Sequence, residues 1–401
     1  PDMNDDRHWI AQRAEELRDD LVCWRRHLHM HPEPSMQEHE TATFVVERLR
    51  EMGIEEIEEG VGETGVVAIA RGQGDRCVAL RADMDALELT EATGAEYASA
   101  NEGVMHACGH DAHTAALLGA AAILRGMGEE LPGIVKLIFQ PGEEGAGGAL
   151  RMIDDGCLRD PRPEAIFAMH AHPDLEQGRV GVTSGFTTAQ SDSVNMTILG
   201  EASHAARPHQ GADAISIAAQ AVIAVQQFVA RCTDPIHRKV VTFGMIEGGT
   251  RRNILADRVQ LTGTIRTYEQ QTREAIIDFL GNRLRTIVTE LGGRLEISID
   301  EGYPPLWNEQ WVLDCAADAA REVLGDDGVE EMPYPSMGAE DFAFFQHVGE
   351  LPAAMMRLGT RDERSGYVHA VHTTRFDLND EVVMPTAAAV YANAALKLLE
   401  R

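Results

Sequence analysis

The sequence predicts an α/β protein in which a mixed, mainly parallel sheet flanked by helices is interrupted by a second, ferredoxin-like domain. Short apolar runs that are typical of strands alternate with helical stretches over the first 185 residues. A block with the order strand–helix–strand–strand–helix–strand follows, and the first pattern then returns. The length of 401 residues exceeds that of one ordinary domain and accommodates two.

The domain limits follow from these changes of pattern. Residues 1–185 and 303–401 form the two parts of the larger domain, and residues 186–302 form the inserted domain. In the larger domain, helical stretches over about residues 7–53 precede four apolar runs with strand character. These predicted strands are GVVAIA (65–70), CVALRADMD (77–85), GIVKLIFQ (133–140) and AIFAMHAHP (165–173).

Composition excludes several classes of protein. The formal net charge is −30, whereas a nucleic-acid-binding protein needs a cationic surface. No uninterrupted apolar run reaches about 18 residues, so we expect no membrane span and no membrane partner. The N-terminal stretch is polar and acidic, unlike a secretion signal, so we expect a cytoplasmic location. The six cysteines are scattered through the chain, which is typical of reduced thiols and not of a disulfide framework.

Polar side chains stand at or just after the ends of the predicted strands. In chain order they are Asp83, Asp85, Glu143, Glu144 and His170. In open α/β sheets, functional groups gather outside the carboxyl ends of the strands, so we expect these side chains to share one site. Adjacent carboxylates do not easily point at the same metal ion. The pair Glu143 and Glu144 therefore predicts one metal ligand and one group that activates water.

The stretch MHACGHDAHTAALLGAA, residues 105–121, contains the densest group of candidate ligands. Cys108 and His110 are two positions apart, so an extended segment would place both side chains on one side of the chain. Asp111 or Thr114 can then cap the helix that follows. The helix N-terminus and an adjacent metal ion would lower the pKa of the thiol and make it a ligand at neutral pH. The remaining histidines of this stretch are interpreted as supporting groups: His106 and His113.

Further candidates lie far from this stretch in the sequence. His372 belongs to YVHAVHTTRFD in the second part of the larger domain. His204 lies in SHAARP near the start of the inserted domain, and Asn253 follows a Gly-Gly turn in EGGTRRN. Histidine is a frequent ligand of zinc and other transition metals, although a single loop histidine is more often structural.

Eight stretches of the chain occur in the order LRADMDAL, MHACGHDAHTAALLGAA, FQPGEEGAGGALRMI, GEASHAARPHQGADAI, GMIEGGTRRN, GTIRT, MGAEDFAFF and VHTTRFD. Together they resemble the dinuclear-metal aminoacylase and carboxypeptidase superfamily. Within it, they are similar to the amidohydrolase subgroup of hippurate hydrolases, auxin-conjugate hydrolases and N-acetyl-diaminopimelate deacetylases. The resemblance covers about residues 24–398. One departure is Glu88, at a position where the subgroup commonly has proline.

The resemblance implies a two-metal site in the larger domain. The implied ligands are Cys108, His110, Glu144, His170 and His372. Cys108 is implied to bridge the two ions, Glu143 to act as the general base, and Asp85 to orient a ligand. A Cys–His–Glu set suits zinc or manganese, with cobalt or nickel as alternatives.

The resemblance also implies roles for the inserted domain, which is similar to the family's lid and dimerisation domain. His204 is implied to stabilise the oxyanion, and Asn253 to hold the substrate. Arg266 is our candidate for binding the substrate carboxylate. The expected assembly is a homodimer or homotetramer that forms through this domain.

The expected activity is hydrolysis of the amide bond of N-acyl amino acids, such as N-acetyl or N-benzoyl derivatives, to a carboxylate and a free amino acid. A dipeptidase or carboxypeptidase with the same dinuclear site is the alternative within this class. A cysteine hydrolase with Cys108 as nucleophile and His110 as base is a rival from another class, and it predicts activity that resists chelators. A non-catalytic protein with a structural metal clasp is a third possibility, but such a clasp would not need Glu143.

Overall fold

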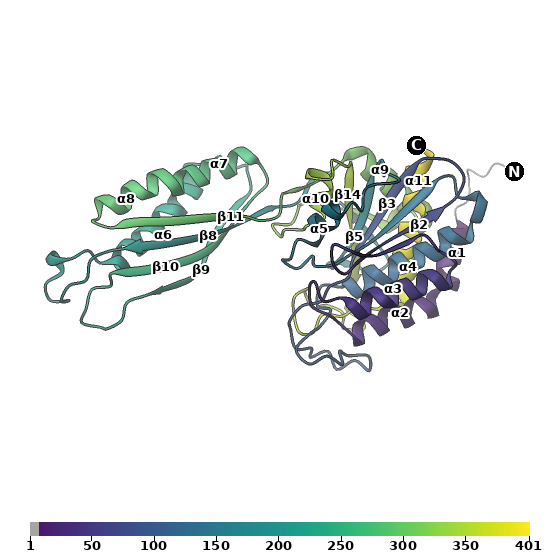
Figure 1. The fold of residues 1–401 in the computed structure, drawn as a ribbon, viewed down its shortest axis with the longest axis horizontal. Coiled ribbons are helices and arrows are strands. Elements are labelled where there is room, and N and C mark those ends of the chain that lie inside the picture. Colours follow the sequence, from purple (N-terminus) through teal and green to yellow (C-terminus); the bar gives the residue numbers. More distant parts are fainter. Residues whose placement is uncertain (1–7) are drawn as a thin grey trace. The chain divides into compact units, whose positions relative to one another are not determined.

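The structure is a computed structural model that describes residues 8–401; the first residues of the polar N-terminal stretch lie outside this range. The chain divides into two compact units (Figure 1). The first unit comprises the residues up to Thr187 together with Trp307–Tyr334 and Asp341–Arg401. The second comprises Thr188–Leu306 and Pro335–Glu340, whereas the sequence pattern divided the chain after residues 185 and 302.

The first unit contains an eight-stranded mixed sheet, which confirms the predicted fold class. Its strands are β1 (Ile57–Val61), β2 (Gly65–Arg71), β3 (Cys77–Asp83), β4 (Ile134–Gln140), β5 (Ile166–Glu176), β6 (Val180–Val182), β13 (Val329–Glu331) and β14 (Ala353–Arg361). Their order is β1-β2-β4-β3-β5-β14-β6-β13, and the consecutive strands β4, β3, β5 and β14 run parallel. The carboxyl ends of β3, β4 and β5 therefore meet at one edge of the sheet.

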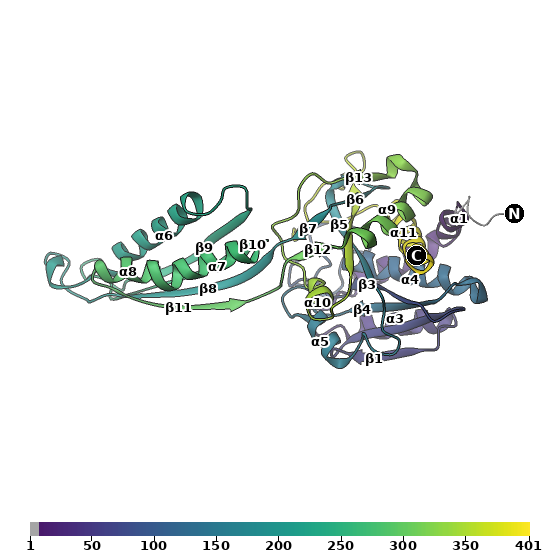
Figure 2. The ribbon, with the colours of Figure 1, turned by 90° about the horizontal axis from the view of Figure 1, so that it is seen from above.

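Helices cover this sheet and share a large apolar core with it (Figures 1 and 2). The helices that contribute to this core are α1 (His8–Glu16), α2 (Arg18–Met30), α3 (His39–Glu51), α4 (His110–Gly126), α9 (Gln310–Leu324) and α11 (Asp380–Glu400). The unit also contains α5 (Gly148–Asp155) and α10 (Ala343–His347). Small residues allow α2, α4 and α11 to pack closely. A Cβ atom added at Gly119 of α4 would lie 2.5 Å from Cδ2 of Leu21 and 2.8 Å from Cβ of Ala388.

The second unit has the predicted order of a ferredoxin-like domain. Its elements are β8 (Gln190–Leu199), α6 (Ala214–Arg231), β9 (Lys239–Gly248), β10 (Arg258–Thr267), α7 (Gln270–Asp278), α8 (Leu284–Glu290) and β11 (Arg294–Glu301). The strands form an antiparallel sheet in the order β11-β8-β10-β9. The sequence predicts one continuous second helix, but a π-helical turn at Phe279–Arg283 separates α7 from α8.

One face of this second sheet is apolar and the other is polar. Val194, Met196 and Ile198 of β8 are buried in a core shared with α6, α7 and α8, and they alternate with residues that include the exposed Ser193 and Asn195. Two short strands, β7 (Gly185–Thr188) and β12 (Leu306–Asn308), lie where the chain passes between the units.

Two helices, α6 and α11, are long and apolar enough to cross a membrane by length and composition. Most of α11 is buried in the core of the first unit, and α6 buries one face against the sheet of the second. Packing within each unit therefore accounts for much of their apolar composition.

Candidate metal centre

The start of α4 positions the first two candidate ligands. The helix begins at His110, and Gly109 before it has a φ of 85°. A Cβ atom at Gly109 would lie 3.0 Å from Cβ of Ala171, so both the conformation and the space favour glycine. Cys108 lies one residue earlier, and the tight turn keeps it beside His110 at the helix N-terminus.

The predicted helix caps are wrong. Gly109 is the N-cap residue, and Asp111 lies inside the first helical turn. The carboxylate of Asp111 accepts a hydrogen bond from Nε of Arg25 at 2.8 Å, and the hydroxyl of Thr114 donates to the carbonyl oxygen of Asp83 at 2.8 Å. Both side chains therefore connect α4 to distant segments of the chain, which a local capping pattern does not reveal.

The five candidate ligands and the candidate base lie together in the first unit. Their donor atoms form overlapping groups within which every atom is within 4.8 Å of the others. The groups are Cys108–His110–His170, Cys108–Glu144–His372 and His110–Glu143–Glu144. Sγ of Cys108 lies 3.5 Å from Nε2 of His170, and Nε2 of His372 lies 3.0 Å from Oε1 of Glu144. Cys108 belongs to two of these groups, so its sulfur atom lies close to both sets of donors.

Backbone carbonyl groups determine which ring nitrogen faces this cluster. Nδ1 of His110 lies 2.9 Å from the carbonyl oxygen of Asp85, and Nδ1 of His170 lies 2.8 Å from that of Ala171. A carbonyl oxygen can only accept, so Nδ1 carries the proton of each neutral ring and Nε2 keeps a lone pair. Nε2 of His110 is buried and has no hydrogen-bond partner among the described residues. An orphaned nitrogen among sulfur and carboxylate donors fits a metal ligand.

Asp85, which follows β3, supports two of the candidate ligands. Its Oδ1 lies 3.1 Å from Nδ1 of His110, and its Oδ2 accepts hydrogen bonds from the backbone of Glu144 at 3.0 Å and from the Ser35 hydroxyl at 2.5 Å. Burial raises the pKa of the Asp85 carboxyl, but these hydrogen bonds outweigh burial and lower it. One carboxylate thus orients the ring of His110 and the backbone of Glu144.

His113 uses both ring nitrogens for support. Nδ1 lies 2.6 Å from Oδ1 of Asp83, and Nε2 accepts the backbone N–H of Ala171 at 2.8 Å. Asp83 also accepts a hydrogen bond from buried Arg81 at 2.7 Å. Burial raises the pKa of Asp83, but the charges of His110 and Arg81 hold it well below its ordinary value. This support fixes β5 directly after His170.

A second buried charge network, centred on Arg25, is absent from the sequence-based prediction. Besides Asp111, the guanidinium contacts Asp377 through Nη2 at 2.7 Å, and Nδ1 of His29 lies 2.7 Å from Asp111. The backbone N–H of His372 donates to the carbonyl of Ala107 at 2.7 Å. The network therefore joins α2, the start of α4 and the segment that carries His372. The only local signal is the polar pair Arg25 and His29, one helical turn apart on α2.

The charge balance of the cluster favours a cation. Hydrogen bonds to Cys108 and Glu144 raise the pKa of His372 to about 10. Burial lowers the pKa of His110, but the charge of Asp83, assisted by a hydrogen bond to Asp85, outweighs burial and raises it well above its ordinary value. Burial also lowers the pKa of nearby His106, to about 4, which keeps that ring neutral. The donor set thus attracts positive charge at His110 and His372, as a metal-binding set does.

Comparison with known proteins agrees with this geometry. Residues 79–397 match the peptidase family M20/M25/M40. The chain belongs to this family. It is 39% identical to "Probable hydrolase sll0100" of Synechocystis over 95% of this chain and 96% of that one. It is 35% identical to the N-acetyl-L-cysteine deacetylase of Bacillus subtilis over 94% of this chain and 88% of that one.

One solved structure of this family has the same fold as this chain. The YXEP protein of Bacillus subtilis, described as a dinuclear metal-binding peptidase of the M20 family, superposes with a TM-score of 0.83 at 32% identity. The match covers 96% of this chain and 99% of that one. This M20 chain is therefore a metal-dependent hydrolase of a family that includes dinuclear metal sites.

The structure places the other three predicted site residues of this M20 chain in the second unit. His204 forms an isolated β-bridge with Ile254, and the backbone N–H of Ala205 donates to the carbonyl of Asn253 at 3.1 Å. His204 and Asn253 therefore lie side by side. Arg266 lies at the other end of β10, eight residues beyond Arg258, which is roughly 26 Å along a strand. The unit brings the first two together and separates them from Arg266.

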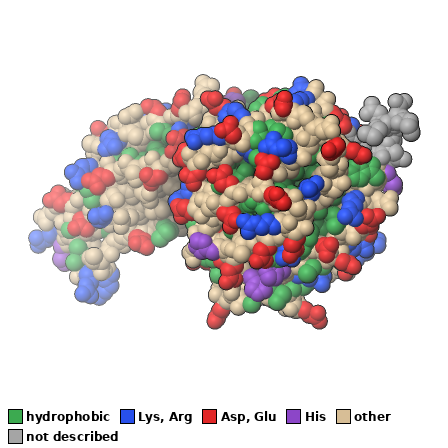
Figure 3. Space-filling model, turned by 45° about the vertical axis from the view of Figure 1, so that its right-hand side comes forward, with side chains coloured by type: hydrophobic (Ala, Val, Ile, Leu, Met, Phe, Trp, Pro, Cys, Tyr) green, Lys and Arg blue, Asp and Glu red, His purple; other side chains and the backbone are tan. Residues whose placement is uncertain are grey.

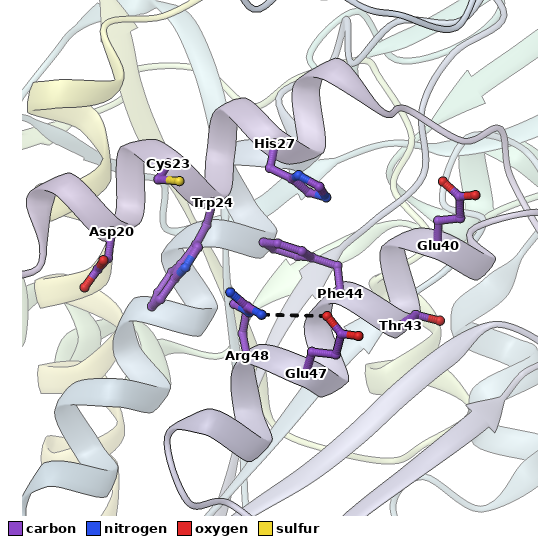
Figure 4. A pocket seen from close by; sticks show the side chains of 9 residues that line it. All are labelled: Asp20, Cys23, Trp24, His27, Glu40, Thr43, Phe44, Glu47 and Arg48. Carbon is purple, nitrogen blue, oxygen red and sulfur yellow. Dashed lines mark ion pairs between the residues drawn. The ribbon is translucent and has the colours of Figure 1, made fainter.

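A surface hollow of about 530 Å³ lies between α2 and α3 of this M20 chain (Figure 4). Trp24 and Phe44 form its apolar part, and an ion pair between Arg48 and Glu47, 3.7 Å apart, lies at its edge. None of the candidate ligands lines this hollow. Acidic and basic side chains are scattered over the face that Figure 3 shows.

Proposed function

We propose that this protein hydrolyses the amide bond of N-acyl amino acids at a dinuclear centre held by Cys108, His110, Glu144, His170 and His372. The observation that carries this proposal is the pair of overlapping donor groups that share Cys108, with the carboxylate of Glu143 beside them. Family membership and the deacetylase activity in a relative's name support the substrate class.

Glu143 is placed to move the proton. It is buried, directly precedes the ligand Glu144, and lies within 4.8 Å of the donor atoms of His110 and Glu144. Two divalent ions at this site supply Lewis acidity that polarises the amide carbonyl and makes water more acidic. Glu143 takes a proton from the attacking water as the new C–O bond forms, and delivers it to the amine nitrogen as the C–N bond breaks.

His204 is suited to stabilise the oxyanion of this reaction. Its Nδ1 accepts the backbone N–H of Ala206 at 3.0 Å, so the neutral ring carries its proton on Nε2. A donor of fixed direction is what an oxyanion requires. Adjacent Asn253 supplies a second polar side chain for substrate. Arg266, the candidate that the sequence offered for the substrate carboxylate, lies at the other end of β10 from this pair, so the geometry of the unit gives that role no support.

Zinc or manganese is the proposed metal, with cobalt or nickel as alternatives, because the donor set combines thiolate, imidazole and carboxylate. A cysteine hydrolase is less consistent with the structure, since burial raises the pKa of Cys108 and opposes a free thiolate. A cytoplasmic location agrees with six cysteines that are all free thiols.

We further propose that the second unit forms a homodimer, or a homotetramer built from it. β9 is an edge strand of its sheet, and Met245 and Ile246 on that strand are more than half exposed. Light scattering should show the oligomer in the native protein and a smaller species for the variant Met245→Lys/Ile246→Lys. A native monomer would contradict this assembly.

The activity is tested by metal analysis of the purified protein, followed by parallel assays with N-acetyl amino acids, N-benzoyl amino acids and dipeptides. We expect the N-acyl amino acids to be hydrolysed fastest, chelation to abolish the activity, and one metal to restore it. Faster cleavage of dipeptides would favour the dipeptidase or carboxypeptidase alternative. Activity that survives chelation but not alkylation of Cys108 would favour the cysteine hydrolase.

A further inference from the structure

Strands β5 and β14 open to solvent at the same register. β5 is buried from Ile166 to Met169 and becomes partly exposed at His170 and His172. β14 is buried except at Arg357 and at its last residue, Arg361, which are partly exposed. Arg357 pairs directly with His170 in the parallel ladder between these strands.

This pairing places three side chains on one face of the sheet. Residues opposite one another on neighbouring strands point to the same face, and so do residues two apart on one strand. Arg357, His170 and His172 therefore share a face, and His170 is a candidate metal ligand. The sheet thus carries a guanidinium group on the strand next to the metal centre.

The charge of Arg357 reaches both histidines. Burial lowers the pKa of His172, and the charge of Arg357 lowers it further. Burial and the charges of His113 and Arg357 together hold the pKa of His170 well below its ordinary value. The guanidinium also contacts the carbonyl oxygen of Thr187 at 3.5 Å and Sδ of Met355 at 4.0 Å, both long distances.

We propose that Arg357 binds the carboxylate of the amino-acid half of the substrate; this inference rests on the proposed function. In an N-acyl amino acid a single carbon atom separates that carboxylate from the scissile nitrogen. A substrate whose amide lies at the cluster of His170 therefore brings its carboxylate close to the neighbouring strand. The net charge of −30 repels a carboxylate, so a local cation is needed to hold it. The planar guanidinium matches a carboxylate with two parallel hydrogen bonds.

The variant Arg357→Gln tests this role by comparing the best N-acyl amino acid of the assay panel with its carboxamide, which lacks the charge. We expect kcat/KM for the carboxylate substrate to fall about 100-fold, mainly through KM, and that for the carboxamide to change less than about threefold. Arg357→Lys should recover part of the loss, because it keeps the charge but not the fork. Arg361→Gln, on the same strand but paired with Glu363 at 2.6 Å, is the matched control and should leave both substrates unaffected.

Two further measurements separate binding from an indirect effect through His170. Metal content should equal that of the native enzyme, and calorimetry in a Glu143→Gln background should show weaker binding of the carboxylate substrate only. Equal losses on both substrates, or loss of metal, would overturn the inference while the proposed function stands. A native enzyme that is inactive on every N-acyl amino acid would overturn both. If Arg357→Gln does not fold, Arg357→Lys carries the same comparison of substrates.

Discussion

The two units of this protein bury charge very differently. The first unit encloses the side chains of Arg25, Arg81 and Lys136 almost completely, together with Asp83 and Asp111. The core of the second unit is apolar, and its main buried ion pair joins Asp192 to Arg273, a residue that keeps some contact with solvent. Buried ion pairs carry a desolvation penalty, so they are weak evidence of stabilisation.

The difference between the units shows where side chains have to be held in one position. Two buried networks of the first unit end on a candidate ligand or its neighbour: Asp83 through His113 at β5, and Asp111 beside His110. Fixed hydrogen bonds hold such groups in one orientation before substrate or metal arrives. The second unit presents His204 and Asn253 through backbone contacts between two loops, without a comparable buried network.

The largest expected effect concerns the base in the first unit. Glu143→Ala should retain both metals, because Glu143 is not among the proposed ligands, and should reduce kcat by about 10³-fold or more. Metal analysis and steady-state kinetics check this prediction. His204→Ala in the second unit is the companion variant, and it should reduce kcat less. Normal turnover by the Glu143 variant would mean that the mechanism is wrong.

The contrast in buried charge predicts unequal losses of stability. Arg25→Met leaves Asp111 and Asp377 without their cation and should destabilise the first unit by about 3–5 kcal/mol. Arg273→Met removes the partner of Asp192 in the second unit and should cost about 1–3 kcal/mol. Denaturant unfolding followed by probes in each unit gives both values. Equal losses of stability in the two variants would contradict the difference in buried charge between the units.

A fall in pH should weaken the Arg25 network first at Glu91, which contacts His29 at the edge of the network. Burial raises the pKa of Glu91, but hydrogen bonds from His29 and Ser99 outweigh burial and lower it to about 2. A depressed pKa stabilises the fold above the ordinary carboxyl value, and this contribution is lost as the pH falls from about 4.5 towards 2. The stability difference between the native protein and Glu91→Gln should therefore shrink over this range. A difference independent of pH would contradict the assignment.

The smallest effects should have opposite signs in the two units. Gly109 has a positive φ, and the substitution Gly109→Ala would bring a Cβ to 3.0 Å from Cβ of Ala171. It should destabilise the first unit by about 1–2 kcal/mol and weaken metal binding. Gly281 lies in the π-helical turn, where an added Cβ would meet no heavy atom within 4 Å apart from its chain neighbours and the helix backbone. Gly281→Ala should therefore stabilise the second unit by about 0.5–1 kcal/mol. Thermal unfolding and metal titration measure both. A stabilising Gly109 variant would show that the ligand turn tolerates a side chain.

The sequence by itself determined the element order, and the motifs that it shares with a known family implied the candidate ligands. Short continuous apolar runs, alternating runs and helical stretches report local burial, so β3, β4 and β5 and the inserted βαββαβ block were predictable. Polar residues at strand ends marked the site because parallel strands bring their carboxyl ends to one edge. The same local reasoning mistook Asp111 for a cap, since its real partner, Arg25, is 86 positions away.

Only the tertiary structure decided which charges meet. Arg25 contacts Asp377 across 352 positions of the chain, and Arg357 stands beside His170 because β14 pairs with β5. No local period encodes either neighbour, since strand order and helix packing are set by burial of the whole core. The same packing separated Arg266 from His204, at opposite ends of one sheet. The candidate ligands were implied by motifs in the sequence, whereas their supporting charges follow from the topology that brings distant segments together.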